Sequence, residues 1–382
     1  MKKTFQYKLY ISKRNRELEE QIEIAAEIWN YCIYLHKHYY RLTGKHLSKG
    51  VLQKHITKQK KRSKHAHWNC LGSQAIQDVT DRIERAYQLF FNKTNKRPPS
   101  FKKKSKYKSF TLKQAGYKLF DDNRIQINGT VYKYFKSRET EGTVKTVTVK
   151  RDSLGDIYLY IVCDVEQIQV SAGTGKMVGY DFGLHTYLKA SDENDIESPL
   201  FFEQNAAVIK KLNRELSRKA EGSNHREQSR LKLARAHRKT ANKRKDFQFN
   251  LAYELCSEYA VICIEDLNIK AMQRLWGKRI SDLSHSSFVR ILKYVASVTG
   301  TKIVEISRWY PSSKTCSVCG HILDELPLRV REWECPVCGS RHDRDFNAAV
   351  NILREGASSL GLDTVRPASA GEYCLNPESA RL

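Results

Sequence analysis

Two pairs of cysteines form the most specific chemical pattern in this sequence. Cys316 and Cys319 make one CxxC motif, Cys335 and Cys338 make a second, and 15 residues separate the two pairs. Each motif presents two thiolates from one tight turn, so the four together would form the closed tetrahedral site typical of structural Zn²⁺. An iron–sulfur cluster or two disulfides are the alternatives. The other six cysteines are scattered singly, a pattern that favours a metal site in a reducing compartment.

Three acidic residues form the second pattern, because each stands at the end of a predicted strand or the start of a predicted helix. Asp181 follows the apolar strand 177–180, Glu265 follows the apolar strand 260–264, and Asp345 opens a helix. In an open α/β sheet, ligands gather beyond the carboxyl ends of the strands. Carboxylates brought together there repel one another unless cations lie between them. A pair of Mg²⁺ ions that hydrolyses phosphodiesters fits such a site.

Each carboxylate taken singly also has an ordinary structural explanation. Asp181 is compatible with a turn, Glu265 with a strand-end charge, and Asp345 with an acid at a helix N-terminus. Their joint placement favours a catalytic site. Asp343 competes with Asp345 for the third position: helical phase groups Asp345 with an apolar stripe, and Asp343 has the pattern of a helix cap, but periodicity alone leaves the choice open.

The chain carries a large excess of positive charge, with 67 Lys and Arg against 42 Asp and Glu and a formal net charge of +25. Such an excess indicates a polyanionic partner, and phosphate backbone is the obvious one. The segment 93–108 mixes basic and aromatic residues, although a flexible charged linker explains its composition equally well. The helical stretch 206–245 has 14 Lys and Arg from Lys210 onward against three Glu, which favours a groove lining over a solvated face. The residues expected to contact nucleic acid are Lys102, Lys103, Lys104, Lys210, Arg214, Arg218, Arg235, Lys239 and Lys243.

The predicted elements indicate several domains, since 382 residues exceed what one hydrophobic core usually supports. Short strands dominate 124–165, and an α/β pattern follows from 177 onward. No apolar run reaches the roughly 18 residues of a membrane span, and the N-terminus lacks the apolar stretch of a signal peptide. We therefore expect a cytoplasmic protein with no membrane partner.

With these motifs in order, the sequence resembles the TnpB family, the insertion-sequence-encoded RNA-guided nucleases related to type V CRISPR effectors. Weaker matches are Trp29-Asn30-Tyr31 and the helix 74–91. The specific matching parts are Gly179–Gly183, Ile264–Leu267, Pro311–Gly320, Trp333–Gly339, His342–Ile352 and the tail 366–371.

The resemblance implies a multidomain α+β protein: a wedge β-barrel split by a helical recognition domain, then an RNase H-like (RuvC) α/β nuclease domain interrupted by the four-cysteine zinc ribbon. The expected ranges are 1–11 for the first wedge strand, 12–115 for the recognition domain, 116–170 for the rest of the wedge, 171–310 for the first part of the nuclease domain, 311–341 for the ribbon, 342–356 for the last nuclease helix and 357–382 for a disordered tail.

The resemblance also implies a Mg-dependent endonuclease in which a guide RNA from the element's own end directs cleavage of double-stranded DNA beside a short target-adjacent motif. It assigns Asp181, Glu265 and Asp345 as the catalytic triad. It places the helix 74–91 near that motif, where Gln77, four residues after Ser73, could pair with an adenine edge. A surface glutamine is an equally good explanation. A monomer in the cytoplasm of a bacterium or archaeon, associated with the nucleoid, is expected.

Two rival functions share parts of this pattern. A transposase would use similar carboxylates to join strands, and a nuclease-inactive repressor would bind DNA through a guide RNA without cutting it. The intact carboxylates argue against the repressor. The ribbon between the second and third carboxylates argues against the transposase.

Overall fold

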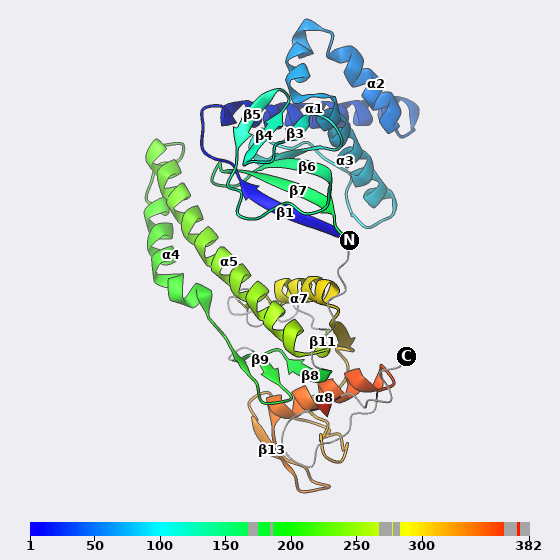
Figure 1. Ribbon diagram of the computed structural model, residues 1–382, viewed down its shortest axis with the longest axis vertical. Coiled ribbons are helices and arrows are strands. Elements are labelled where there is room, and N and C mark those ends of the chain that lie inside the picture. Colours follow the sequence, from blue (N-terminus) through cyan, green and yellow to red (C-terminus); the bar gives the residue numbers. More distant parts are fainter. Residues whose placement is uncertain (167–174, 184–185, 267–276, 278–282, 363–372, 375–382) are drawn as a thin grey trace. The chain divides into compact units, whose positions relative to one another are not determined.

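The computed structural model describes residues 1–166, 175–183, 186–266, 277, 283–362 and 373–374. The chain divides into two compact units, Met1–Gln167 and Ile168–Leu382 (Figure 1). Within the described residues, no helix combines the length and the apolar character needed to cross a membrane.

The first unit contains two antiparallel sheets. The larger one has the order β1-β7-β6-β2 and the smaller one the order β3-β4-β5. A bridge between Leu9 and Tyr134 links the end of β1 to the smaller sheet. β7 alternates buried and half-buried residues, as expected for a strand with one face on a core. The strands are β1 Lys2–Lys8, β2 Ser109–Leu112, β3 Tyr117–Leu119, β4 Arg124–Ile127, β5 Thr130–Lys133, β6 Thr143–Arg151 and β7 Ile157–Asp164.

Three helices pack on these sheets and share one core with them. They are α1 Asn15–Thr43, α2 Lys49–Gln59 and α3 Ser73–Phe91, with 3₁₀ turns at Ser63–Leu71 and Lys104–Lys106. The apolar stripe of α1, which runs from Leu18 to His36, is buried. α1 ends at Gly44, whose left-handed backbone (φ 67°) lets its N–H bond the carbonyl of Tyr40.

The second unit is built on a sheet in the order β10-β9-β8-β11-β12. β8, β11 and β12 run parallel, and β9 pairs with β8 in the antiparallel sense. The strands predicted at 177–180 and 260–264 are confirmed as β8 and β11. The strands are β8 Lys176–Asp181, β9 Thr186–Ala190, β10 Ile196–Glu197, β11 Val261–Glu265 and β12 Lys302–Ile306.

Helices cover both faces of the parallel strands, which explains why these strands are short unbroken apolar runs. Val178 and Ile262 point into a core shared with α5 and α7. Met177 and Val261, on the opposite face, pack in a second core with α8. The helices of this unit are α4 Phe201–Ser217, α5 Asn224–Glu258, α7 His285–Thr299 and α8 Arg344–Ser358.

The helical stretch expected at 206–245 is a hairpin of two helices. α4 ends at the cap residue Arg218, and α5 begins after Ser223, whose hydroxyl accepts the N–H of Arg226. The two helices lie side by side along their length (Figure 1). Arg218 therefore belongs to the turn of the hairpin and not to a continuous helical face.

Two expected boundaries differ from the structure. β2 pairs with β6, so the larger sheet takes a strand from the range 12–115 expected for the helical domain. Within the range 357–382 expected to be disordered, α8 continues to Ser358 and Tyr373–Cys374 pair with β8. The remainder of that tail, 363–372 and 375–382, lies outside the described residues.

Candidate active site and metal centre

Asp181 and Glu265 stand at the ends of two adjacent parallel strands. β8 and β11 pair with Tyr180 opposite Ile264, so the next residue of each strand lies at the same edge of the sheet. Side chains alternate along a strand. Met177 and Val261, four residues earlier, pack on the α8 side of the sheet. Asp181 and Glu265 therefore belong to the face of the sheet that α8 covers.

Helix α8 lies against this face at unusually short range because glycine stands on both sides of the contact. A Cβ atom added to Gly179 of β8 would meet the carbonyl oxygen of Ala349 at 2.3 Å. A Cβ atom added to Gly356 of α8 would meet Sγ of Cys263 on β11 at the same distance, 2.3 Å. Any larger residue at either position would push the helix off the sheet. This docking sets the position of the N-terminus of α8, which carries Asp345.

The structure assigns different roles to Asp343 and Asp345. Asp343 is the N-cap of α8, and its Oδ1 accepts the N–H of Phe346 at 2.7 Å. The Asp343 carboxylate therefore serves to cap the first turn of α8. Asp345, in the first turn, is half-buried and forms an ion pair with Arg331 at 3.1 Å. Arg331 was not identified from the sequence.

The three carboxylates act on one another electrostatically. Burial and the nearby Asp345 carboxylate raise the pKa of Asp181 to about 7. Burial and the charge of Asp181 raise the pKa of Glu265 to about 7. Both shifts have the direction expected for carboxylates crowded without a counter-cation. In the absence of a cation, this crowding favours the protonated forms of Asp181 and Glu265.

The four cysteines of the two CxxC motifs come together in space. Their four Sγ atoms all lie within 4.8 Å of one another. Among the described residues, no other group of three or more possible metal ligands is as close together. The Sγ atoms of Cys316 and Cys338 lie 3.7 Å apart, and those of Cys319 and Cys335 lie 3.6 Å apart. Four sulfurs at about 2.3 Å from a tetrahedral zinc ion would be about 3.8 Å from one another. All four thiols are free, so the disulfide alternative is wrong.

Both cysteine pairs sit in knuckles of the same construction. The N–H of Gly320 bonds the carbonyl of Cys316, and the N–H of Gly339 bonds that of Cys335, each at 2.9 Å. A short hairpin, β13 Glu332–Glu334 with β14 Arg341–Asp343, carries the second knuckle. His342 of β14 is buried, and its Nε2 lies 3.1 Å from Sγ of Cys316. An imidazole donating to a sulfur stabilises the thiolate form that a metal requires.

Two buried asparagines of α8 hold the first knuckle. Asn347 accepts the N–H of Ser317 at 2.9 Å and donates to the carbonyl of Thr315 at 2.8 Å. Asn351, one turn later, donates to the carbonyls of Ser312 at 2.8 Å and Thr315 at 2.6 Å. The sequence alone did not predict a role for either asparagine. The signal was present, since two amides four residues apart on an otherwise apolar helix face need buried partners.

The basic segment at 102–104 is fastened to α1, so the flexible-linker interpretation is wrong. The backbone of Lys102 exchanges two hydrogen bonds with the side chain of Asn30, at 2.8 and 2.9 Å. Its ammonium lies 3.7 Å from the centre of the Trp29 ring, and burial lowers its pKa. Lys104 pairs with Glu27. All three lysines are exposed, and within the described residues Lys103 is the one that makes neither an ion pair nor a ring contact.

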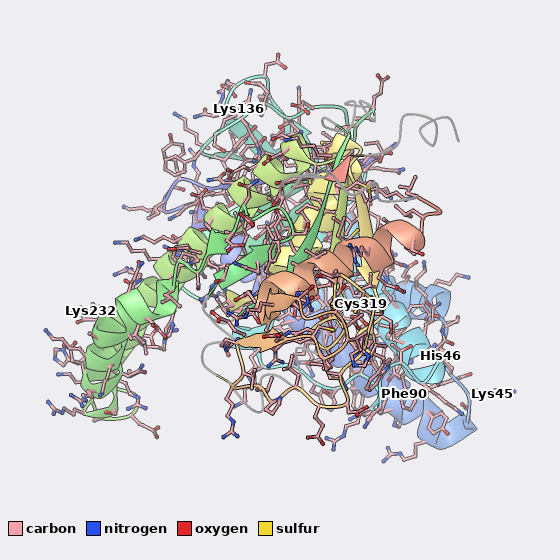
Figure 2. The ribbon with its side chains drawn as sticks, turned by 90° about the horizontal axis from the view of Figure 1, so that it is seen from below. Lys45, His46, Phe90, Lys136, Lys232 and Cys319 are labelled. Carbon is pink, nitrogen blue, oxygen red and sulfur yellow. The ribbon has the colours of Figure 1, made fainter. Side chains whose placement is uncertain are left out.

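The predicted basic residues of the α4–α5 hairpin are all exposed. Figure 2 shows the hairpin, with Lys232 labelled, carrying its side chains out from the second unit. On α5 the three predicted residues recur every four positions and so lie on one side of the helix. The exposed set is Lys210, Arg214, Arg218, Arg235, Lys239 and Lys243.

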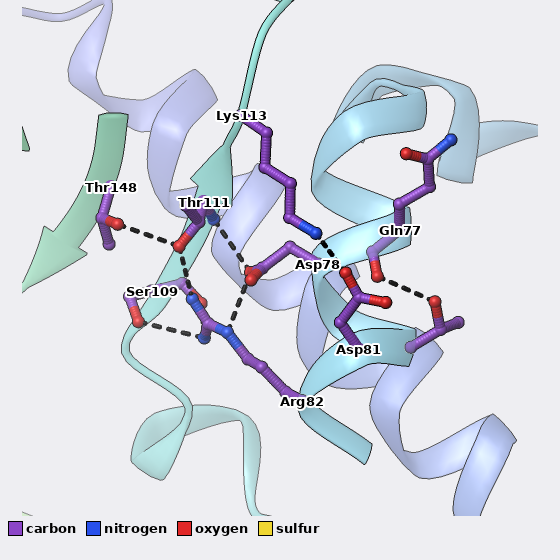
Figure 3. A network of polar contacts seen from close by, with 9 residues as sticks. Gln77, Asp78, Asp81, Arg82, Ser109, Thr111, Lys113 and Thr148 are labelled. Carbon is purple, nitrogen blue, oxygen red and sulfur yellow. Dashed lines mark hydrogen bonds and ion pairs between the residues drawn. The ribbon is translucent and has the colours of Figure 1, made fainter. Parts of the chain in front are cut away.

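Ser73 and Gln77 are both exposed at the start of α3. Figure 3 shows the Gln77 side chain directed away from the polar network that fixes this helix to β2. In that network, Asp78 accepts the N–H of Thr111 at 3.0 Å, and Arg82 donates to the carbonyl of Ser109 at 2.8 Å. These bonds hold the helix firmly. Within the described part of the chain, the side-chain amide of Gln77 makes no hydrogen bond.

Comparison with known proteins identifies the family. A family model described as "Probable transposase" matches residues 160–275, and another described as "Cas12f1-like, TNB domain" matches residues 285–352. A Streptomyces pristinaespiralis protein named "Putative RNA-guided DNA endonuclease" is 32% identical over 82% of this chain and 79% of its own length. The Escherichia coli relative InsQ, given the same description, is 30% identical over 75% of each chain. The chain belongs to this family, the TnpB family.

Solved structures show the same fold at low sequence identity. A Cas12f1–sgRNA–target DNA complex matches with a TM-score of 0.58 and 15% identity, covering 90% of this chain and 83% of that one. The mini RNA-guided endonuclease CRISPR-Cas_phi3 matches with a TM-score of 0.53 and 11% identity, covering 97% and 93%. The mixed α/β architecture is therefore shared with these solved structures. Closure of the wedge sheets into a barrel and the RNase H-like description of the second unit stay predictions.

Proposed function

We propose that this protein is an RNA-guided DNA endonuclease that hydrolyses phosphodiesters of double-stranded DNA at Asp181, Glu265 and Asp345. The observation that carries the proposal is electrostatic: the charge of Asp345 acts on Asp181, and the charge of Asp181 acts on Glu265. Two of the three carboxylates come from the ends of adjacent parallel strands, and the third comes from the helix that glycine contacts dock onto the same face. The names of the relatives, which describe RNA-guided DNA endonucleases, support the same function.

The carboxylates fit a pair of Mg²⁺ ions because their charges are crowded and incompletely neutralised. Oxygen ligands of this kind suit Mg²⁺, which when bound would supply activation of water and stabilisation of the leaving oxygen. Asp181 and Glu265 would hold the ions from the strand ends. Asp345 would complete the ligand set once its pairing with Arg331 loosens. Cation binding also relieves the repulsion that raises the pKa values of Asp181 and Glu265.

The four cysteines would hold one Zn²⁺ with a structural role, because four thiolates leave no open position for a substrate. The first knuckle rests on Asn347 and Asn351 of α8. Zinc would thus stabilise the same helix that carries Asp345, which connects the ribbon to the catalytic site through a rigid element.

Guide RNA and target DNA would occupy the exposed basic faces, with Lys103 and the α4–α5 hairpin contacting phosphates. Base pairing with a guide RNA from the element's own end would select the sequence, and the protein would recognise only a short motif beside it. We assign the exposed Gln77 and Ser73 to that motif. A monomer associated with bacterial or archaeal nucleoid DNA fits this arrangement.

The test begins with sequencing of the RNA that copurifies with the protein. A guide built from that RNA should direct cleavage of a matching linear duplex in Mg²⁺ or Mn²⁺. Ca²⁺ should permit binding with little cutting, because its looser geometry positions water poorly. Asp181→Ala, Glu265→Ala and Asp345→Ala should each lower the cleavage rate by several orders of magnitude and leave guided binding intact.

Asp343→Ala is the matched control, because it removes a carboxylate of the same helix end that serves as a cap. It should reduce cleavage far less than Asp345→Ala. Full cleavage by Asp181→Ala would overturn the mechanism. Guided binding without cleavage by the wild-type protein would identify a repressor, and joined DNA strands among the products would identify a transposase.

A further inference from the structure

The first unit contains an aromatic cavity that the nuclease function does not use. Its volume is about 420 Å³, within the range of about 300–1,000 Å³ that is typical of small-ligand sites. The C-terminal parts of α1 and α3, the loop after α1, and the proline segment after α3 form its walls. The lining residues are His36, Lys37, Tyr40, Gly44, Lys45, His46, Tyr87, Phe90, Phe91, Pro98 and Pro99.

The rings of this cavity already contact one another in stacked and edge-on arrangements. His36 stacks on His46 with ring centres 4.9 Å apart, and Tyr87 lies 4.5 Å from His36. Phe91 meets His46 edge-on at 5.4 Å. Phe91 keeps 55% of its surface exposed, far more than a ring whose only role is packing. Planar π-faces next to an open space suit another flat ring.

The polar groups of the cavity favour an anionic ligand with hydrogen-bonding atoms. Lys37 and Lys45 line it, and within the described residues neither ammonium pairs with a carboxylate. His36 is 4% exposed, and its Nε2 has no hydrogen-bond partner in the described structure. A buried polar atom without a partner is costly, and a ligand that supplied the missing bond would recover that cost. Figure 2 shows Lys45, His46 and Phe90 gathered at this end of the helical region.

We propose that this cavity binds one unpaired nucleotide of a single strand, with its base stacked among Phe91, His46 and Tyr87 and its phosphate near Lys45. A nucleotide combines the three properties that the lining matches: a flat ring, edge atoms able to bond His36, and a negative charge. An apolar peptide would leave the Lys45 ammonium and the His36 nitrogen without a partner; the Lys37 ammonium already lies 4.6 Å from the centre of the Phe101 ring. The proposal rests on the nucleic-acid binding in the proposed function and does not depend on cleavage.

Photocrosslinking tests this site in the full-length protein, after bound RNA is removed at high salt. The probes are five-nucleotide strands with one central 4-thiouridine in RNA or one central 4-thiothymidine in DNA. Adducts should map by mass spectrometry to the cavity residues, and the preferred strand identifies the sugar that the site accepts. Phe91→Ala should lower the adduct yield at these residues about 10-fold, the scale of one lost base stack. Lys45→Ala should lower it less and flatten its salt dependence.

Tyr34→Ala is the matched control. Tyr34 lies on α1 two residues before His36, so it points to another side of the helix, and it is exposed to a similar extent, 53%. The adduct yield of the Tyr34→Ala variant should equal that of the wild type. The yield of the Asp181→Ala variant should also equal it, which would show that the cavity acts independently of cleavage. Adducts confined to α5 would overturn the proposal. So would competition by inorganic phosphate as effective as competition by a nucleoside monophosphate, because the cavity would then recognise only the anion.

Discussion

Nδ2 of Asn351 lies 2.6 Å from the carbonyl oxygen of Thr315, the residue immediately before Cys316, the first cysteine of the cluster. This bond joins the helix of Asp345 to the cysteine knuckle at a point that excludes water. Asn347 repeats the connection one turn earlier. The geometry of the cysteine cluster and the position of Asp345 are therefore connected through a single helix, α8.

Asn351→Leu should weaken this coupling. The substitution keeps the branched shape and the number of heavy atoms of the side chain, and it leaves the Ser312 and Thr315 carbonyls with fewer partners, a loss of about 1–3 kcal/mol for a buried group. Chemical denaturation should show the lower free energy of unfolding, and the zinc released to a colorimetric chelator should appear faster. Asn205→Leu is the control, because within the described residues the Asn205 side-chain amide bonds the carbonyl of Phe201 in its own helix and no other group. Equal zinc release by the two variants would contradict the coupling.

Removing one cysteine ligand should destabilise the second unit. Purified protein should contain about one zinc atom, and Cys316→Ser or Cys335→Ser should lower both the zinc content and the melting temperature, because metal binding contributes directly to folding. Elemental analysis gives the content and calorimetry the temperature. Cys70→Ser, at an exposed free cysteine outside the cluster, should change neither. Iron in place of zinc, or active protein without metal, would contradict the assignment.

Because burial raises the pKa of Asp181, we expect the free energy of unfolding to fall as the pH rises. Asp181 has a pKa of about 7 in the folded protein and about 3.9 when unfolded. The folded state therefore holds the proton longer, and this group costs stability progressively as the pH rises from about 4 to about 7. Zinc-loaded protein without magnesium should melt a few degrees lower than Asp181→Asn at pH 8. The difference should shrink at pH 5.

Added Mg²⁺ gives the complementary measurement. At pH 8 it should raise the melting temperature of the wild type, because an ion that binds only the folded protein stabilises it by mass action. Asp181→Asn should respond much less. An equal response of both proteins to Mg²⁺ would show that the ion binds elsewhere.

Neutralising the basic face of α5 should weaken nucleic-acid binding without regard to sequence. The triple variant Arg235→Ala, Lys239→Ala, Lys243→Ala removes three exposed charges. Its salt slope for guide RNA should fall by up to about three, near one for each lost phosphate contact. Titrations at several salt concentrations measure this slope. An unchanged slope would mean that these side chains are only solvated.

Gln77→Ala should change the preferred target-adjacent motif more than the cleavage rate. The Gln77 side chain is exposed on a helix held by the network around Asp78 and Arg82, so its loss should leave the fold intact. A motif-depletion assay with a randomised flank reports the preference. Gln88→Ala, at an exposed position later on α3, is the control. Identical motifs for wild type and Gln77→Ala would remove this residue from motif reading.

The strands that end in Asp181 and Glu265 were predictable because a parallel strand buried on both faces is a short apolar run that stops at a charge. The choice between Asp343 and Asp345 was not, since a cap depends on the backbone angles of one residue. The break between α4 and α5 escaped detection because basic residues continue through it. The contacts of Lys102 with Asn30 and Trp29 join residues 72 and 73 positions apart along the chain, and composition carries no information on such contacts.

The late position of α8 has a consequence for the timing of synthesis. Asp345 follows Glu265 by 80 residues, and ribosomes add about 5–20 residues per second. A growing chain therefore carries two of the three carboxylates for roughly 4–16 seconds before the third is made. During that interval the face of the sheet that α8 will cover has no helix to meet it. The set of three carboxylates is complete only after the segment that contains Asp345 has been synthesised. A nascent chain that ends before this segment lacks the third carboxylate.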